Sequence, residues 1–510
     1  MKATRKEWIG LAVIALPCVI YSMDLTVLFL AVPSISEQLR PSSTQLLWIS
    51  DVYGFMVAGS LITMGTLGDR IGRRRLLLVG AGLFGAASVL AAFSRTASML
   101  IATRALLGVA GATVAPSTLS LIRNMFADPH ERTVAISVWL TAYSVGAVVG
   151  PLLGGVMLVH FWWGSVFLLA LPVMLVLLVL GPMLLPEFRD PNARRLDVFS
   201  AALSLVAVLS VIYGLKRIAA DGFSWAWALV IAFGFVIGAL FVRRQHRLAD
   251  PLIDLALFRS PAFSVALGTY MVSVFVIFGV GLLIAQYMQL VLGFSPLKAG
   301  LWTLPGACGF IAGSLSSPPI IRHFRPAMIV GGCLTLGAVG FALIMQANGS
   351  SALAFIVVGG TLAQFAISPV VTLATDLIVG AAPPERAGAA SAISETSAEF
   401  GGALSIAILG SIGTAVYRAQ MSNAALDGLT PDVVASARNT LGGAVATAAT
   451  LPGQQSVELL GVARDAFTRA LEVTAGISAA LSIAAAVVAV GVLRRIRPVP
   501  VVHAEPVEAD

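Results

Sequence analysis

Charged side chains are scarce in this sequence. Asp, Glu, Lys and Arg make up 11% of its 510 residues, whereas hydrophobic residues make up 58%. An average soluble protein has about 25% charged residues, which keep its surface hydrated. The composition therefore excludes a soluble protein of this length and predicts that most of the chain lies within a membrane.

Cysteine and lysine are also rare. The three cysteines, Cys18, Cys308 and Cys333, lie in apolar stretches, and an odd number there argues against a disulfide framework. No Cys and His spacing is typical of a metal site. None of the four lysines follows a glycine, as the lysine of a P-loop would. We therefore predict neither an enzyme nor a metal or cofactor, and we expect any uphill transport to use a proton gradient.

Fourteen apolar stretches are long enough to cross a membrane, which takes about 20 helical residues. With the N-terminus placed inside, the inner loops hold 22 Lys and Arg and the outer loops hold 9, while Arg104 lies within a span. This bias predicts that both termini are cytoplasmic, and it assigns the net charge of +7 to membrane topology and anionic lipid rather than to nucleic acid. The predicted spans are 8–32, 46–67, 76–93, 98–122, 133–158, 165–185, 198–217, 225–242, 263–290, 299–321, 327–346, 353–379, 388–413 and 470–493.

One long outer segment covers about 414–469. Thr430-Pro431-Asp432 is a helix-start pattern, because proline suits the first helical turn. Leu451-Pro452-Gly453 interrupts the helical pattern that follows. We expect two short helices that form a hairpin on the outer face.

A glycine-rich inner loop follows the second span and holds one aspartate among four arginines. Such a turn can join neighbouring helix ends through charge-assisted hydrogen bonds, although a simple positively charged anchor is the alternative. Arg104 must face the interior and find partners there, because a guanidinium in hydrocarbon costs several kcal/mol. The loop reads Gly65-Thr-Leu-Gly-Asp69-Arg70-Ile-Gly72-Arg73-Arg74-Arg75.

The fifth span contains closely spaced small residues. Glycines let two helices approach closely, and a proline bends the span, so helix packing alone is one interpretation. The segment reads Gly146-Ala-Val-Val-Gly150-Pro151-Leu-Leu-Gly154.

Acidic residues within apolar spans are functional candidates, because a lone carboxylate there is costly. Asp24 lies in span one, and Glu395 and Glu399 lie one turn apart on one face of span thirteen. Two such carboxylates repel, so at least one is expected to bind a proton near neutral pH, unless an arginine or hydroxyl satisfies each of them permanently. Asp51 and Asp376 lie nearer span ends, where a local salt bridge is a serious alternative.

Aromatic and amide side chains could line a central cavity for a lipophilic cation, since ring faces attract cations. For each of them helix packing is equally plausible. These candidates are Phe29, Trp48, Tyr53, Tyr143, Gln286, Tyr287 and Gln364.

The loop from Gly65 to Arg75 resembles the best-known motif of the major facilitator superfamily, and the resemblance implies that Asp69 and Arg73 lock one conformation. The Gly146–Gly154 segment resembles the motif of its antiporters. With fourteen predicted spans, the chain resembles the drug:proton antiporter branch, the group of the QacA and SmvA exporters. The pair Trp162-Trp163 is more similar to SmvA than to QacA. Further matching segments begin at Asp24, Trp48, Phe161, Asp250 and Ala381.

The resemblance implies an all-α integral membrane fold with a six-helix bundle in 1–190, two additional, peripheral helices in 191–260 and a second bundle in 261–497. The tail in 498–510 contains Pro498, Pro500 and Pro506, and its composition predicts that it is disordered. The resemblance assigns Asp24, Asp51, Glu395 and Glu399 to proton coupling and cation recognition. Phe29, where many members have Asn, and Leu107, where many have Gln, depart from the pattern and leave fine substrate preference open.

The expected function is proton-coupled export of lipophilic cations such as quaternary ammonium compounds, dyes and viologens by a monomer in a bacterial inner membrane. The bundles would rock around a central site. A permease for a physiological metabolite or lipid is the alternative. A non-transporting receptor or scaffold fits less well, because the chain has intramembrane acids and lacks a large cytoplasmic domain.

Overall fold

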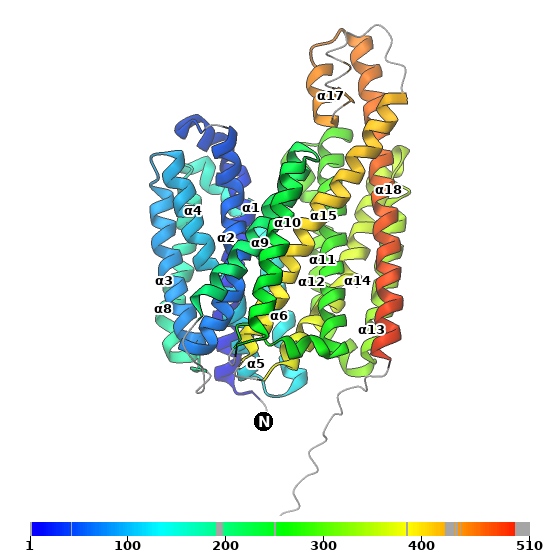
Figure 1. The fold of residues 1–510 in the computed structure, drawn as a ribbon. Helices are drawn as coiled ribbons and strands as arrows, with labels where there is room; N and C mark the ends of the chain where they lie inside the picture. The colour runs from blue at the N-terminus through cyan, green and yellow to red at the C-terminus, as the bar shows by residue number, and fades with distance from the viewer. Residues whose placement is uncertain are drawn as a thin grey trace, which may run out of the picture.

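The computed structural model describes residues 3–41, 43–189, 197–248, 251–383, 386–423, 434, 437–438 and 440–494. Within these ranges the regular structure is entirely helical. The first helix, α1 (Arg5–Leu39), begins at the end of the molecule where the last helix, α18 (Gly453–Leu493), ends (Figure 1). We call this end the inner end and the opposite one the outer end. The predicted tail, 498–510, lies outside the described residues.

The first six predicted spans are present as helices that pack against one another. Span four is divided into α4 and α5, and span six into α7 and α8. Pro129 begins α6 directly after Asp128, whose carboxylate accepts hydrogen bonds from the amides of His130 and Glu131. The helices are α1 (Arg5–Leu39), α2 (Ser43–Ile71), α3 (Arg73–Ala92), α4 (Ala97–Gly111), α5 (Val114–Met125), α6 (Pro129–His160), α7 (Ser165–Leu168) and α8 (Ala170–Leu184).

The last six predicted spans form the second bundle. Its first helix ends in one π-helical turn, η2 (Tyr287–Val291), and a short 3₁₀ helix, η1 (Leu255–Arg259), precedes it. The long helices are α11 (Pro261–Gln286), α12 (Pro296–His323), α13 (Pro326–Ile344), α14 (Ala352–Ala381), α15 (Ala387–Asn423) and α18 (Gly453–Leu493).

Thirteen stretches of the described chain are helical, long and apolar enough to cross a membrane. The remaining predicted span, 46–67, corresponds to α2, which has 29 residues. The expected set of fourteen long helices is therefore present.

The two additional helices differ in their packing. α9 (Val198–Asp221) lies between the bundles, whereas α10 (Trp225–Gln245) packs on α9 (Figure 1). Phe55 of α2, Ile212 of α9 and Ala403 of α15 belong to one buried cluster. α9 therefore packs on one helix of each bundle, and α2 and α15 also contact each other directly. That the two additional helices are peripheral stays a prediction.

The outer segment is described only in part. α15 extends outward to Asn423, and α18 begins at Gly453, so the two long helices supply the ends of this segment. A short helix, α17 (Leu441–Ala448), packs on α18 at the outer end (Figure 1). The predicted interruption at Pro452 marks the start of α18, and Thr430-Pro431-Asp432 lies outside the described residues.

Candidate functional site

A buried ion pair joins α1 to α4. The Arg104 Nη1 atom lies 2.7 Å from Asp24 Oδ2, and Arg104 Nε donates to the carbonyl oxygen of Ile49 at 3.2 Å. The guanidinium also lies 5.0 Å from the centroid of the Tyr53 ring. Only 1% of Arg104 is exposed. The expectation that Arg104 faces the interior with partners is confirmed, and its main partner is one of the predicted acids.

The two glutamates of α15 lie in a different environment. The Tyr270 hydroxyl of α11 donates to Glu395 Oε1 at 3.3 Å, and Glu399 lies within electrostatic range of Glu395. In the described part of the chain, no Arg or Lys lies within 4.0 Å of the Glu395 carboxylate. Glu395 therefore differs from Asp24, because its described hydrogen-bond partner is neutral.

Tyrosines connect the two acidic positions. Tyr21 and Tyr143 lie within electrostatic range of Glu395, and their ring centroids are 5.5 Å apart. Tyr53 lies within range of both Asp24 and Glu399, 6.0 Å from the Tyr21 ring. The hydroxyls of Tyr53 and Tyr143 are buried and have no hydrogen-bond partner among the described residues. The acids are thus separated by aromatic rings with polar edges.

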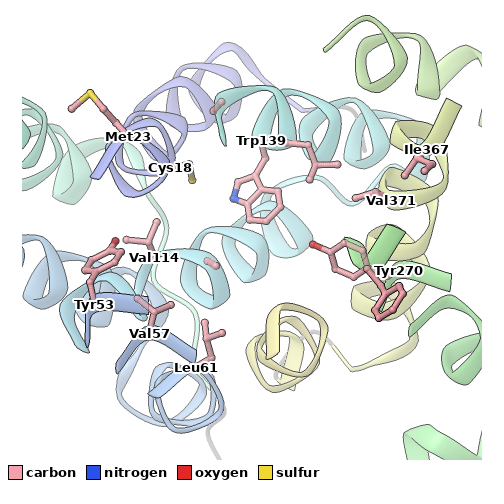
Figure 2. Close-up of a cluster of buried hydrophobic side chains, with 14 of the residues drawn as sticks. Cys18, Met23, Tyr53, Val57, Leu61, Val114, Trp139, Tyr270, Ile367 and Val371 are labelled. Carbon is pink, nitrogen blue, oxygen red and sulfur yellow. The ribbon is translucent and has the colours of Figure 1, made fainter. Parts of the chain in front are cut away.

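Residues from both bundles face this interior. Figure 2 shows Trp139 of α6 and Tyr270 of α11 directed toward the space between the two halves, with Cys18 and Tyr53 on the side of the first bundle. The Trp139 ring contacts Tyr143 at 4.7 Å between centroids, and its Nε1 donates to Thr118. A molecule that reached Glu395 would therefore meet side chains from both bundles.

At the inner end, the glycine-rich loop ties the bundles together. Asp69 forms an ion pair with Arg73, and its carboxylate accepts hydrogen bonds from the first amides of α15, Gly388 at 3.3 Å and Ala389 at 3.1 Å. A helix N-terminus has unpaired N–H groups and a partial positive charge, so it binds a carboxylate favourably. Gly65 allows the approach, since a Cβ there would lie 2.5 Å from the Gly388 oxygen.

The other residues of the loop act within the first bundle. Arg74 Nη1 donates to the carbonyl oxygen of Leu185 at 3.0 Å, and the Arg74 amide donates to Glu187 at 3.2 Å. Gly72 has φ +114°, a conformation that favours glycine, and lies against the Glu187 carboxylate. These contacts hold the end of α8 against the start of α3. Arg70 lines a small inner cavity beside Asp69.

A second tie joins α6 to α14 at the inner end. Arg132 Nε lies 2.6 Å from Asp376 Oδ1, and the Thr133 hydroxyl donates to Asp376 Oδ2 at 3.2 Å. The salt bridge considered for Asp376 is therefore present, although it crosses to the other bundle instead of being local. We call the contacts of Asp69 with α15 and of Arg132 with Asp376 the inner ties.

A profile of the Major Facilitator Superfamily matches residues 14–406. The chain belongs to the major facilitator superfamily. The multidrug efflux pump LfrA of Mycolicibacterium smegmatis is 44% identical over 494 residues, which cover 97% of each chain. The methyl viologen resistance protein SmvA of Salmonella typhimurium is 36% identical over 468 residues, covering 91% of this chain and 93% of the relative.

A solved structure also resembles this superfamily member. The human organic anion transporter MFSD10 has a TM-score of 0.61 at 16% identity and covers 94% of this chain and 100% of its own, a likeness that shows the fold alone. The predicted fold class and the family resemblance are confirmed, and the superfamily consists of transporters rather than enzymes.

In this superfamily member, the predicted cavity residues lie in several places. Tyr53 and Tyr143 lie near the acids, Trp48 stacks on Tyr213 of α9 at 5.9 Å, and Tyr287 donates to the carbonyl oxygen of Ala347 at 3.4 Å. Gln286 ends α11 beside the outer π-helical turn, while Gln364 lines a pocket in the second bundle. The Phe29 side chain lies outside the described residues.

The remaining predicted positions lie on helices of the first bundle. A Cβ at Gly146 would collide with the carbonyl oxygen of Val19, so this glycine brings α6 close to α1. Gly150 and Gly154 are buried on the same helix, the Pro151 side chain lies outside the described residues, and Asp51 is half-buried on α2. Sequence reasoning missed Tyr21 and Tyr270, because a tyrosine in an apolar span gives no signal that separates a site residue from a packing residue.

Proposed function

We propose that this protein is a proton-coupled antiporter that exports lipophilic cations such as quaternary ammonium compounds, dyes and viologens. The observation that carries the proposal is the half-buried Glu395, beside Glu399 in an apolar span, with a tyrosine rather than an arginine as its described partner. A carboxylate in this setting gains by binding either a proton or an organic cation. The names of the relatives, a multidrug efflux pump and a methyl viologen resistance protein, agree with this function.

Competition for the α15 glutamates would couple the two fluxes. A lipophilic cation is attracted by the carboxylates and by the faces of the surrounding tyrosine rings, at roughly 0.5–2 kcal/mol for each ring. Protonation removes the carboxylate charge and releases the cation. Asp24 is the weaker candidate for direct cation binding, because Arg104 already neutralises it and repels a second positive charge.

The inner ties suggest how binding drives the conformational change. Glu395 lies seven residues from Gly388, which is about 10 Å along α15. The N-terminus of the helix that carries the acids is therefore the element that Asp69 holds. We propose that a change of charge at Glu395 shifts α15 and breaks the inner ties, so that the interior opens to the cytoplasm. We further propose that the protein lies in the inner membrane of a bacterium with both termini in the cytoplasm, and that it works as a monomer.

The test uses Glu395→Gln and Glu399→Gln in everted vesicles, with proton release recorded when a mono- or divalent quaternary ammonium compound is added. We expect at least a tenfold loss of drug-driven proton release in one or both variants. The matched control is Glu458→Gln, the same substitution at an exposed position of α18. Unchanged release in both variants would contradict the proposal, and transport of neutral or anionic compounds alone would favour a metabolite or lipid permease.

A further inference from the structure

The second bundle contains a pocket that the proton and cation chemistry does not use. It has a volume of about 110 Å³ and lies between α11, α12, α13 and α14 in the outer half of the molecule. We call it the outer pocket. Its lining includes Gly281, Trp302, Phe341, Gly360, Thr361 and Gln364.

The lining of the outer pocket carries no charge and is mostly apolar. Every lining residue is uncharged, and only Thr303, Thr361 and Gln364 have polar side chains. The Thr303 hydroxyl already donates to the carbonyl oxygen of Gly300 at 2.7 Å. A bound water needs two to four polar partners, whereas an apolar cavity of about 150 Å³ is known to stay dry and to bind benzene. Apart from the Gln364 amide and the Thr361 hydroxyl, which is buried without a hydrogen-bond partner among the described residues, the outer pocket is apolar and suits one ring or a short alkyl segment.

The position of the pocket relates it to the α15 acids. Tyr270, which donates to Glu395, lies on the same face of α11 as Ile277, Gly281 and Ile284 of the pocket, because these positions follow it by 7, 11 and 14 residues. Seven residues correspond to about 10 Å along the helix. One continuous face of α11 thus leads from the acidic site to the outer pocket.

We propose that the outer pocket binds the hydrocarbon tail or ring of an amphipathic cation whose charged end lies at Glu395 and Glu399. This inference rests on the proposed function and specifies its substrates: the preferred compounds carry one cationic end and an apolar extension directed toward the outer end. Compact cations bind at the acids alone and gain nothing from the pocket.

Two glycines allow the pocket to be filled without disturbing its walls. A Cβ added at Gly281 of α11 or at Gly360 of α14 would meet nothing within 4 Å, so Gly281→Leu and Gly360→Leu each place a side chain in open space from a different helix. The neighbouring Gly359 is unsuitable, because a Cβ there would lie 2.5 Å from the Gly340 oxygen. The matched control is Gly332→Leu on the exposed side of α13, where a Cβ also meets nothing within 4 Å.

The experiment measures the affinity of the purified full-length protein for alkyltrimethylammonium ions from butyl to octyl. In the unmodified protein and in Gly332→Leu, each added methylene should tighten binding by up to about fourfold until the pocket is full. In both filled variants the affinity should no longer depend on chain length, while butyl binding changes less than twofold. Equal slopes in filled and control proteins of unchanged thermal stability would overturn the inference.

Two further measurements distinguish a bound lipid from a substrate, and the pocket from the acids. The first measurement looks for a phospholipid that copurifies with the unmodified protein but not with Gly360→Leu. If such a lipid is found and the two proteins show equal chain-length slopes, a membrane lipid occupies the pocket and the assignment to substrate is overturned. Glu395→Gln should weaken binding of every homologue and keep the slope. If Glu395→Gln left binding and proton release unchanged while the slope remained, the proposed coupling and the placement of the charged end at Glu395 would fail, and the assignment of the apolar tail to the pocket would stand.

Discussion

Replacing Asp376 by Asn should shift the transporter away from the conformation described above. The substitution leaves the Arg132 guanidinium at the bundle interface without its carboxylate, and removing one member of a buried ion pair costs about 3–5 kcal/mol. Both side chains are 11% exposed, so solvent screens part of this cost. We therefore expect the substitution to destabilise the conformation closed at the inner end by about 2 kcal/mol. This lowers the ratio of molecules closed at the inner end to molecules open there by a factor of about 30.

The assay is a distance distribution between spin labels on the two bundles. Labels at His130 and Met328, both exposed near the inner end, report separation of the bundles there. Asp376→Asn should increase the population with the longer distance. The double variant Arg132→Gln/Asp376→Asn should return toward the unmodified distribution, because no unpaired charge remains at the interface. Identical distributions in the single and double variants would refute the assignment of this ion pair as an inner tie.

Three other perturbations test separate parts of the structure. Gly388→Ala should open the inner end in the same spin-label assay, because its methyl group would collide with the Arg73 guanidinium; an unchanged distribution would argue against this tie. Arg104→Lys should lower thermal stability by about 1–3 kcal/mol, since lysine cannot make both hydrogen bonds, whereas the exposed Arg75→Lys should not. Burial raises the pKa of Asp197, the N-cap of α9, but hydrogen bonds from Ser200 and Arg244 outweigh burial and hold that pKa below its ordinary value. The cap then stabilises the folded state above the pKa of the unfolded chain, and this contribution is lost as the pH falls through the folded-state pKa. Asp197→Ala should therefore cost about 1 kcal/mol at neutral pH and less in acid, and a pH-independent loss in thermal unfolding would contradict this role of the carboxylate.

The helices could be predicted from sequence because length and hydropathy determine which segments cross a membrane. The need for a partner to Arg104 also followed from the cost of a charge in hydrocarbon. The tie between Arg132 and Asp376 could not be predicted, since the residues are 244 positions apart and each is a plausible loop or helix-end charge. The packing of α9 between the bundles was equally hidden, because an apolar helix has the same composition against lipid as against protein.

The inner ties and the acids converge on α15. Asp69 binds its first amides, Glu395 and Glu399 lie along its middle, and Ala403 contacts the buried cluster of α2 and α9. A rigid helix transmits a displacement along its whole length, so a force on the glutamates acts directly on the contacts with Asp69. The first bundle supplies the counterpart: the Asp24 and Arg104 pair is neutral overall and fixes α1 to α4. In the proposed mechanism, the charge that changes therefore lies on α15, the helix that contacts both bundles, and the constant, paired charge lies within the bundle against which α15 would move.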